Sequence, residues 1–535
     1  TGNKRMADNP GNEQTSGAIG TQAVDWYGRH LEGPKGFYTI ISSVLVALFL
    51  IRGFLFDGAT NDDAEQLLFS QDFAWGYILG NPPLYTWIVI AAQQVIGINL
   101  PSVTAVKFAL LWLTYHFLFK SARMVLDDDR LAIVAALSPF GFYYVAWDAL
   151  LGYSHTVLAA CLYAATFLGV LRARSRGDLK SFVLLGVAIG LGLISKYTYV
   201  LFTMAMTCAC FADPAFRKHL FRPYVLATIV IAGAIASPHF AWVIAQSDQI
   251  SAAAEGKFEI AAGSNYAMTV LSGFANSLSI VTGFLSPLWI ILLAVFHRAI
   301  WERLRSAVAP NRHQRFMAVY LMALVALLVG AVLVFEITKL RPHYMFLLVL
   351  FPIFFFAFLK PVLKNTRSLR VYHVILLSLA VFALAGMTIK YVSEPWRCKR
   401  CQLLLPYDEI ARQIRQSGYK NGTIFAYWFP HALPGNLRVY FPDQRIVSVK
   451  FTKLAPAPSG GSGQCLMIWM PKPRGVMDAK GMIQISNRQL GVSVPDREKF
   501  LWAPVRNIEF TYARTESRTD QLHFILLENG QGKCR

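Results

Sequence analysis

The chain has 535 residues, 55% of them hydrophobic, and its mean hydropathy is +0.41. This composition excludes an ordinary soluble domain, in which roughly 45–50% of residues are apolar. The formal net charge of +20 would suit a protein that binds nucleic acid. The positions of the basic residues argue against that class and for a protein that crosses a membrane several times.

Lys and Arg residues gather in short segments between apolar runs, and the alternate segments hold few of them. The basic segments are 120–130, 172–180, 217–222, 298–315 and 360–370. This alternation is typical of cytoplasmic loops, which carry an excess of Lys and Arg. The positive charge therefore indicates orientation, with a cytoplasmic N-terminus, and no nucleic-acid partner.

Apolar runs that approach the ~20 residues of a bilayer core predict about eleven membrane spans. The expected spans are 37–55, 103–119, 131–147, 154–171, 181–195, 197–212, 223–243, 283–297, 316–335, 344–360 and 371–391. If 84–98 also spanned, every later basic segment would change sides. We therefore expect 84–98, and similarly 267–282, to be juxtamembrane helices that lie in the interface.

The spans divide the chain into a polar cytoplasmic N-terminus at 1–36, a transmembrane domain at 37–391 and a periplasmic domain at 392–535. The first outer loop of the transmembrane domain covers 57–102. In the last part, 407–417 has helical periodicity, and strands are expected at 423–428, 445–449, 464–470 and 523–527. The predicted fold is an α-helical polytopic membrane protein with a small C-terminal α/β domain.

Four of the seven cysteines lie beyond the last apolar run, at Cys398, Cys401, Cys465 and Cys534. An even number in a segment outside the cytoplasm predicts disulfides. If Cys398 and Cys401 form a local pair, Cys465 and Cys534 remain for a second one. A redox motif or half of a zinc site is the alternative interpretation of the Cys-x-x-Cys spacing.

An acidic cluster without any Lys or Arg opens the first outer loop, at Asp57, Asp62, Asp63 and Glu65. Carboxylates at a membrane surface with no local cation are costly unless they have a function. They could serve chemistry, because a carboxylate can act as a general base. They could also serve structure alone, because acidic side chains favour the first turn of a helix.

Three segments, taken in order, resemble a known family. The first segment holds Asp62-Asp63 and then Asn81-Pro82-Pro83-Leu84-Tyr85. The second is Gly192-Leu193-Ile194-Ser195-Lys196-Tyr197-Thr198, and the third is Lys339-Leu340-Arg341-Pro342-His343-Tyr344. The order resembles the bacterial dolichyl-phosphate-mannose–protein mannosyltransferase-like superfamily, glycosyltransferase family 39, which includes the lipid A aminoarabinose transferase. The resemblance covers roughly 37–395. Asp63 stands where the family usually has Glu, and Asn81 where it usually has His.

The resemblance implies the C-type glycosyltransferase fold and makes Asp62 the candidate catalytic base. Asp63 would orient the acceptor, help to bind a divalent cation or only start the helix. Asp148 corresponds to a second acidic residue of the family on the next outer loop. No cofactor is required by these motifs, although a role for Mg²⁺ or Mn²⁺ is left open.

A cationic cluster lies on the outer side, where cations are otherwise scarce. The resemblance makes it the site for the lipid phosphate of the donor, formed by Lys339, Arg341, His343, Tyr344 and Lys196. Cations there would neutralise the charge of the leaving phosphate. The alternative is that these side chains reach out to membrane lipid headgroups. Candidate substrate-binding residues are His155, Asn81 and Tyr85.

The predicted function is that of an inverting glycosyltransferase of the bacterial inner membrane. It would move a sugar from a polyprenyl-phosphate donor to an envelope glycolipid, lipopolysaccharide core or lipid A, at the periplasmic face. Some alphaproteobacterial members of the family move uronic acids, so galacturonic acid is a candidate sugar. The alternatives are protein O-mannosyltransferase-like activity and a transporter or flippase for a lipid-linked sugar, although transporters tend to show internal repeats.

Overall fold

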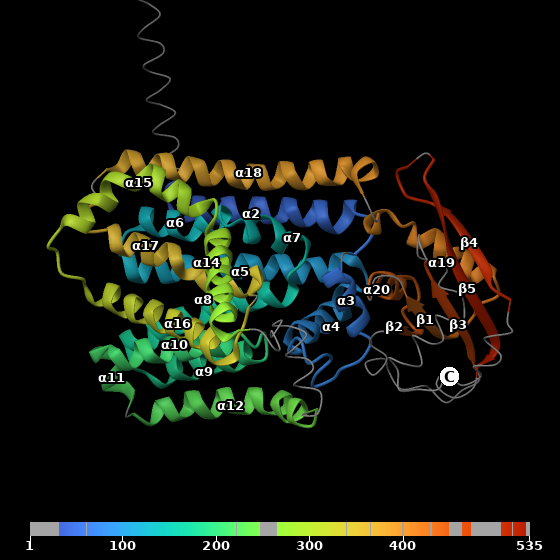
Figure 1. Ribbon diagram of the computed structural model, residues 1–535, viewed down its shortest axis with the longest axis horizontal. Helices are drawn as coiled ribbons and strands as arrows, with labels where there is room; N and C mark the ends of the chain where they lie inside the picture. The colour runs from blue at the N-terminus through green and yellow to red at the C-terminus, as the bar shows by residue number, and fades with distance from the viewer. Residues whose placement is uncertain are drawn as a thin grey trace, which may run out of the picture.

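The computed structural model describes residues 31–59, 61–220, 222–246, 265–338, 340–363, 365–398, 401–427, 431–448, 463–471, 504–515 and 517–530. A helical bundle occupies the larger part of the molecule, and a smaller α/β domain packs against one end of it (Figure 1). The N-terminal segment 1–30 and Lys339 lie outside the described residues, as does Cys534.

The bundle is built from helices that run mostly along the longest axis of the molecule (Figure 1). Its elements are α2 (Pro34–Leu50), η1 (Ile51–Leu55), α3 (Asn61–Phe69), α4 (Leu84–Ile96), α5 (Leu100–Leu126), α6 (Asp129–Leu137), η2 (Ser138–Gly141), η3 (Tyr144–Asp148), α7 (Ala149–Leu151), α8 (Ser154–Arg176), α9 (Leu179–Leu193), α10 (Tyr199–Ala212), α11 (Pro214–Leu220), α12 (Pro223–Ile244), α14 (Tyr266–Leu285), α15 (Leu288–Arg305), α16 (Arg312–Phe335), η5 (Pro342–Leu350), α17 (Phe351–Leu359) and α18 (Thr366–Arg397).

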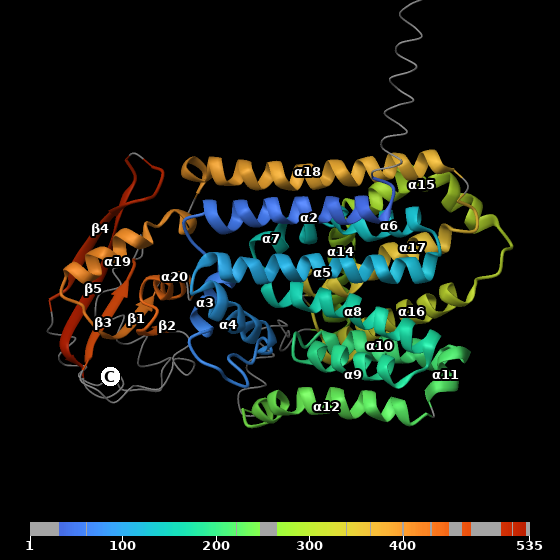
Figure 2. The ribbon, with the colours of Figure 1, turned by 180° about the vertical axis from the view of Figure 1, so that it is seen from behind.

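Among the described residues, eight helices are long and apolar enough to cross a membrane, and α4, α9 and α10 are shorter apolar helices. This agrees with the predicted polytopic class, while the number of crossings stays a prediction. Helix α14 is long enough to span, but it runs nearly perpendicular to α2 and α18 in both views (Figures 1 and 2). Its direction fits the interfacial helix expected at 267–282.

Two expected spans were wrong in their boundaries. The segment 131–147 is broken after α6 into the 3-10 turn η2 and the π-helical turn η3, with Pro139 near the start of η2. The segment 283–297 contains the end of α14 and the start of α15, with Pro287 between them. Proline lacks a backbone N–H and its ring clashes with the preceding turn, so a helix is interrupted at both places.

The C-terminal domain is a five-stranded sheet in the order β2-β1-β3-β5-β4, with β2, β1 and β3 parallel and the other pairs antiparallel. Its elements are η6 (Gln402–Leu404), α19 (Tyr407–Gln416), β1 (Gly422–Tyr427), α20 (Ala432–Tyr440), β2 (Arg445–Ser448), β3 (Gly463–Trp469), β4 (Arg506–Thr511) and β5 (Thr519–Gly530). The expected helix and four strands are present. Strand β4 and helix α20 were not predicted.

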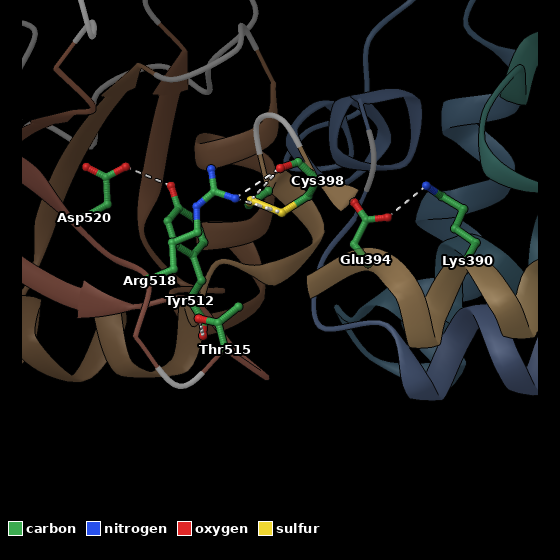
Figure 3. Close-up of a disulfide and its surroundings, with 8 residues drawn as sticks. Lys390, Glu394, Cys398, Tyr512, Thr515, Arg518 and Asp520 are labelled. Atoms are coloured by element: carbon green, nitrogen blue, oxygen red, sulfur yellow. Dashed lines mark hydrogen bonds and ion pairs between the residues drawn. A yellow bond between two sulfur atoms is a disulfide. The ribbon is translucent and has the colours of Figure 1, made fainter. Parts of the chain in front are cut away.

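A disulfide joins Cys398 and Cys401 where α18 passes into the C-terminal domain. Arg518 donates a hydrogen bond of 3.1 Å to the carbonyl oxygen of Cys398, beside the disulfide (Figure 3). Cys465 is fully buried in β3, and Cys534 lies outside the described residues. The second predicted pair therefore stays a prediction.

The first outer loop is shared between the two parts of the molecule. Its residues Leu68, Phe69 and Tyr77 belong to the apolar core of the C-terminal domain, together with side chains of α19, α20 and the sheet. Burial of such side chains stabilises by about 1.5–3 kcal/mol each. The loop that holds the acidic cluster is thus packed between the bundle and the C-terminal domain.

Candidate active site

Asp62 lies in the first turn of α3, at the end of the bundle that faces the C-terminal domain (Figure 1). Its side chain is half-buried, and Oδ2 accepts a hydrogen bond of 2.5 Å from the backbone N–H of Tyr153. Within the described part of the chain, Oδ1 accepts no hydrogen bond. One oxygen is therefore held in place while the other is available to a substrate.

Tyr153 brings Asp148 close to Asp62. Its backbone is left-handed, with φ 58°, immediately before α8 begins. Burial raises the pKa of Asp148, and an interaction with the Tyr153 hydroxyl partly offsets that rise. Burial, with Asp148 nearby, raises the pKa of Tyr153 to about 12, so the phenol stays protonated and can donate a hydrogen bond. Two predicted acidic residues thus meet around one tyrosine.

The basic and aromatic residues of the predicted phosphate site lie on the other side of Tyr153. The ring centroid of His343 is 5.4 Å from that of Tyr153, and the ring of Tyr344 is 5.7 Å from Lys196 Nζ. Lys196 is buried, and its ammonium group donates a hydrogen bond to Thr156 Oγ1. Three segments that are far apart in the chain, around residues 62, 153 and 343, therefore converge.

For two members of the predicted phosphate site, the described residues show no side-chain hydrogen bond or ion pair that would hold them there. Lys339 lies outside the described residues. Arg341 is exposed, and its side chain makes no hydrogen bond or ion pair with another described residue. Both stay predictions, whereas Lys196 is buried and is placed beside the Tyr344 ring.

His155, Asn81 and Tyr85 differ in their access to a substrate. His155 Nε2 lies 3.2 Å from Gln66 Nε2, and Thr86 donates to Gln66 Oε1 at 2.7 Å, which ties α3, α4 and α8 together. Tyr85 is fully buried, with its ring 5.6 Å from that of His155. His155 and Tyr85 are both buried, so they are better placed to support the site than to contact a substrate.

Asn81 lies in the turn before α4 and is half-buried. Three residues later, the backbone N–H of Leu84 donates a hydrogen bond of 3.2 Å to the carbonyl oxygen of Ile194. This contact docks the Asn81-Pro82-Pro83-Leu84 turn against the end of α9, two residues from Lys196. The position is compatible with a substrate contact, which stays a prediction.

Asp63 points away from the site, into the bundle. Its Oδ2 accepts a hydrogen bond of 2.9 Å from Arg52 Nη2, and its Oδ1 accepts one of 2.6 Å from Lys107 Nζ. All three side chains are 0% exposed. Because both oxygens are bound to buried cations, this geometry favours a structural role for Asp63 over the predicted catalytic or metal-binding ones.

Arg52 and Lys107 were missed in the sequence, although a signal existed. Each is an ionisable residue inside an apolar segment, and such residues mark functional or paired positions. Among the described residues, no group of three His, Cys, Asp or Glu side chains is arranged to hold a metal ion.

The membrane-capable helices and the comparisons with known proteins together give the class: a polytopic membrane glycosyltransferase of the C-type fold. The crystal structure of ArnT from Cupriavidus metallidurans bound to undecaprenyl phosphate is similar over 92% of this chain and 98% of that chain, with a TM-score of 0.57 and 14% sequence identity. The apo state of the same protein gives a TM-score of 0.55 at 13% identity. At this identity the likeness shows the fold.

The sequence comparisons found one family model and two relatives that are similar to this chain. The family model for dolichyl-phosphate-mannose-protein mannosyltransferase matches residues 80–242. The lipopolysaccharide core galacturonosyltransferase RgtA of Rhizobium johnstonii is 29% identical over 441 residues, 81% of this chain and 86% of that protein. RgtB of the same organism is 24% identical over 462 residues, 85% and 90% of the two chains. These matches agree with the superfamily that the motifs resemble.

Proposed function

We propose that this glycosyltransferase moves a uronic acid, galacturonic acid in the first instance, from a polyprenyl-phosphate donor to the lipopolysaccharide core. The sugar and the acceptor are those in the names of RgtA and RgtB. A lipid-phosphate donor is supported by the undecaprenyl phosphate named for the ArnT structure. The observation that carries the proposal is the half-buried Asp62, which faces a site bordered by Lys196, His343 and Tyr344.

In the proposed reaction, a hydroxyl oxygen of the acceptor attacks the anomeric carbon of the donor sugar. The bond between that carbon and the phosphate oxygen breaks, and polyprenyl phosphate leaves with the electron pair. The proton of the attacking hydroxyl goes to Asp62, which acts as the general base. Attack from the side opposite the leaving phosphate inverts the anomeric centre. Asp148 and the Tyr153 hydroxyl would orient the acceptor beside the base.

Lys196 would hold the leaving phosphate. The hydrogen bond to Thr156 fixes its ammonium group, and the aromatic rings of Tyr344 and His343 cover the adjacent surface. A preorganised cation contributes most where negative charge develops, since it needs no reorganisation during the reaction. Lys339 and Arg341 would add further charge from the late outer loop.

We further propose that the C-terminal domain and the site face the periplasm, with the protein in the bacterial inner membrane. Helix α11 and the facing ends of α15 and α16, which carry Arg303, Arg305, Arg312 and Arg315, lie at the end of the bundle opposite the C-terminal domain (Figure 1). The positive-inside rule assigns that opposite end to the cytoplasm. A donor linked to a lipid would then reach the site from the outer leaflet.

Lys196→Ala is expected to weaken donor binding and to slow transfer, each by about 10-fold or more, because the contact strengthens as the phosphate gains charge. Lys196→Arg should restore only part of both, because a planar guanidinium does not replace a compact ammonium in a buried position. Binding of a polyprenyl phosphate and single-turnover transfer measure the two effects separately.

Lys360→Ala is the matched control for this substitution. Lys360 also donates its ammonium to an oxygen of the protein, the backbone carbonyl of Leu126, but this contact is at the C-terminal end of α5, whereas Asp63 of α3 binds Lys107 near the N-terminal end of α5. Donor affinity should be unchanged in this variant. Wild-type donor affinity in Lys196→Ala would remove Lys196 from the phosphate site and leave Lys339 and Arg341 as candidates.

A further inference from the structure

Helix α20 of the C-terminal domain packs on α3, the helix that carries Asp62. The packing between these two helices is more extensive than that between α3 and any helix of the bundle. At its closest point, a Cβ added to Gly435 would lie 2.0 Å from the carbonyl oxygen of Ala64. Only glycine allows the two backbones to approach so closely.

Asn436 joins α20 to Ala59, which lies just before α3 begins. Its Oδ1 accepts a hydrogen bond of 2.8 Å from the backbone N–H of Ala59, and its Nδ2 donates one of 3.3 Å to the carbonyl oxygen of the same residue. The Nδ2 also donates to Ala432 at 2.7 Å, and the side chain is 4% exposed. Ala59 stands three positions before Asp62 in the sequence.

The C-terminal domain also holds the far end of α3. Gln71, two residues after the helix, donates a hydrogen bond of 2.9 Å to the carbonyl oxygen of Ile446 and accepts one of 2.8 Å from its N–H. In the middle of the helix, Glu65 lies 3.2 Å from His431. The start, the middle and the end of the Asp62 segment are therefore all attached to the same domain.

We propose that Gly435 and Asn436 are positioning residues for the transfer reaction, so that the C-terminal domain sets where the Asp62 carboxylate lies relative to Tyr153 and the donor. This inference rests on the proposed role of Asp62 as the base. A buried amide is needed at 436 because the position requires a donor and an acceptor together. Loss of either leaves a buried backbone group of Ala59 without its partner.

Asn436→Ala tests the inference. A shift of a base by about 1 Å can cost 10²-fold in rate, so we expect transfer at saturating donor to slow by about 10- to 100-fold. Affinity for the polyprenyl-phosphate donor should stay near that of the wild type, because Lys196 lies in the turn between α9 and α10 and its neighbours Thr156 and Tyr344 lie on α8 and η5. Single-turnover transfer and donor binding on the full-length protein in detergent or nanodiscs give both values.

Gln464→Ala is the matched control. Gln464 is also a buried amide that bridges backbone groups, because it accepts from Lys420 N at 2.5 Å and donates to the carbonyl oxygen of Gly418 at 2.8 Å. Both of these contacts lie within the C-terminal domain and away from α3. The two variants should lower the thermal stability similarly, while only Asn436→Ala slows transfer.

A double-mutant cycle with Asp62→Asn separates this inference from the proposed function. If Asn436 acts through Asp62, Asn436→Ala should cause little further loss in the Asp62→Asn background. The inference is overturned if Asn436→Ala transfers at the wild-type rate, or if it slows both backgrounds by the same factor. Near-normal transfer by Asp62→Asn alone would refute the base itself.

If Asn436→Ala does not accumulate in the membrane, Gln71→Ala replaces it in the cycle. Gln71 is partly exposed, so Gln71→Ala does not empty a buried side-chain position. It does remove the attachment at the far end of α3. We expect a smaller loss of transfer rate with unchanged donor affinity. Equal rates for this variant and the wild type would then overturn the inference.

Discussion

Asp62→Asn is expected to lower the transfer rate by at least ~100-fold, the usual scale for loss of a general base. Asparagine has the size of aspartate, and its carbonyl oxygen can still accept the hydrogen bond from Tyr153 N–H. It cannot take a proton from the acceptor hydroxyl. The variant should therefore fold, bind the donor with nearly normal affinity and fail in the chemical step, as single-turnover transfer would show.

Asp72→Asn is the control for charge in the same loop, since Asp72 is exposed and its Oδ1 accepts a hydrogen bond from the adjacent Phe73 N–H. This variant should transfer at a rate close to that of the wild type. If the transfer rate of Asp62→Asn is within a few-fold of the wild-type rate, Asp62 is not the base. Its role would then be structural, at the start of α3 and in the hydrogen bond with Tyr153.

Asp63→Asn should act on stability, since it leaves the buried cations Arg52 and Lys107 without their counterion. Breaking a buried ion pair by removing one partner costs about 3–5 kcal/mol. We expect a large fall in the unfolding temperature of the purified protein, or failure to accumulate in the membrane.

A second substitution that removes one of the unbalanced charges makes the stability test specific. Asp63→Asn combined with Lys107→Met should be more stable than Asp63→Asn alone, because the second change removes one of the two unbalanced charges. A stable Asp63→Asn protein that binds donor and transfers as slowly as Asp62→Asn would instead establish a direct role for Asp63 in the reaction, such as the orientation of the acceptor expected from the sequence. Thermal unfolding in one detergent, measured for all three variants, decides between the two roles.

The adjacent acids show where prediction from sequence succeeds and where it ends. The alternation of basic loops predicts that Asp62, Asp148, Lys196 and His343 lie on one side of the membrane, and in the structure contacts through Tyr153, Thr156 and Tyr344 bring these residues close to one another. Adjacent residues of a helix point about 100° apart, so Asp62 and Asp63 face different surroundings. Which of them faces the site depends on the packing of α3, which no local pattern contains.

The elements that were not predicted from the sequence can be explained in similar physical terms. Helix α20 contains Pro434 and Gly435, residues of low helix propensity, and it forms because its backbone packs on α3. Strand β4 carries a weak but readable signal, with Ile508 and Phe510 buried and their neighbours exposed. The helix breaks near Pro139 and Pro287 interrupt apolar runs that look continuous by hydropathy alone, although the prolines themselves were visible.

The most direct test of the central claim is transfer by the purified protein. Wild-type protein would be incubated with synthetic polyprenyl-phosphate galacturonic acid and a lipopolysaccharide core acceptor, and the acceptor would be analysed by mass spectrometry. We expect its mass to rise by one uronic acid residue, with inverted anomeric configuration and release of polyprenyl phosphate, and no such product with Asp62→Asn. An unmodified acceptor, together with intact donor moved across a vesicle membrane, would contradict the claim and identify a transporter.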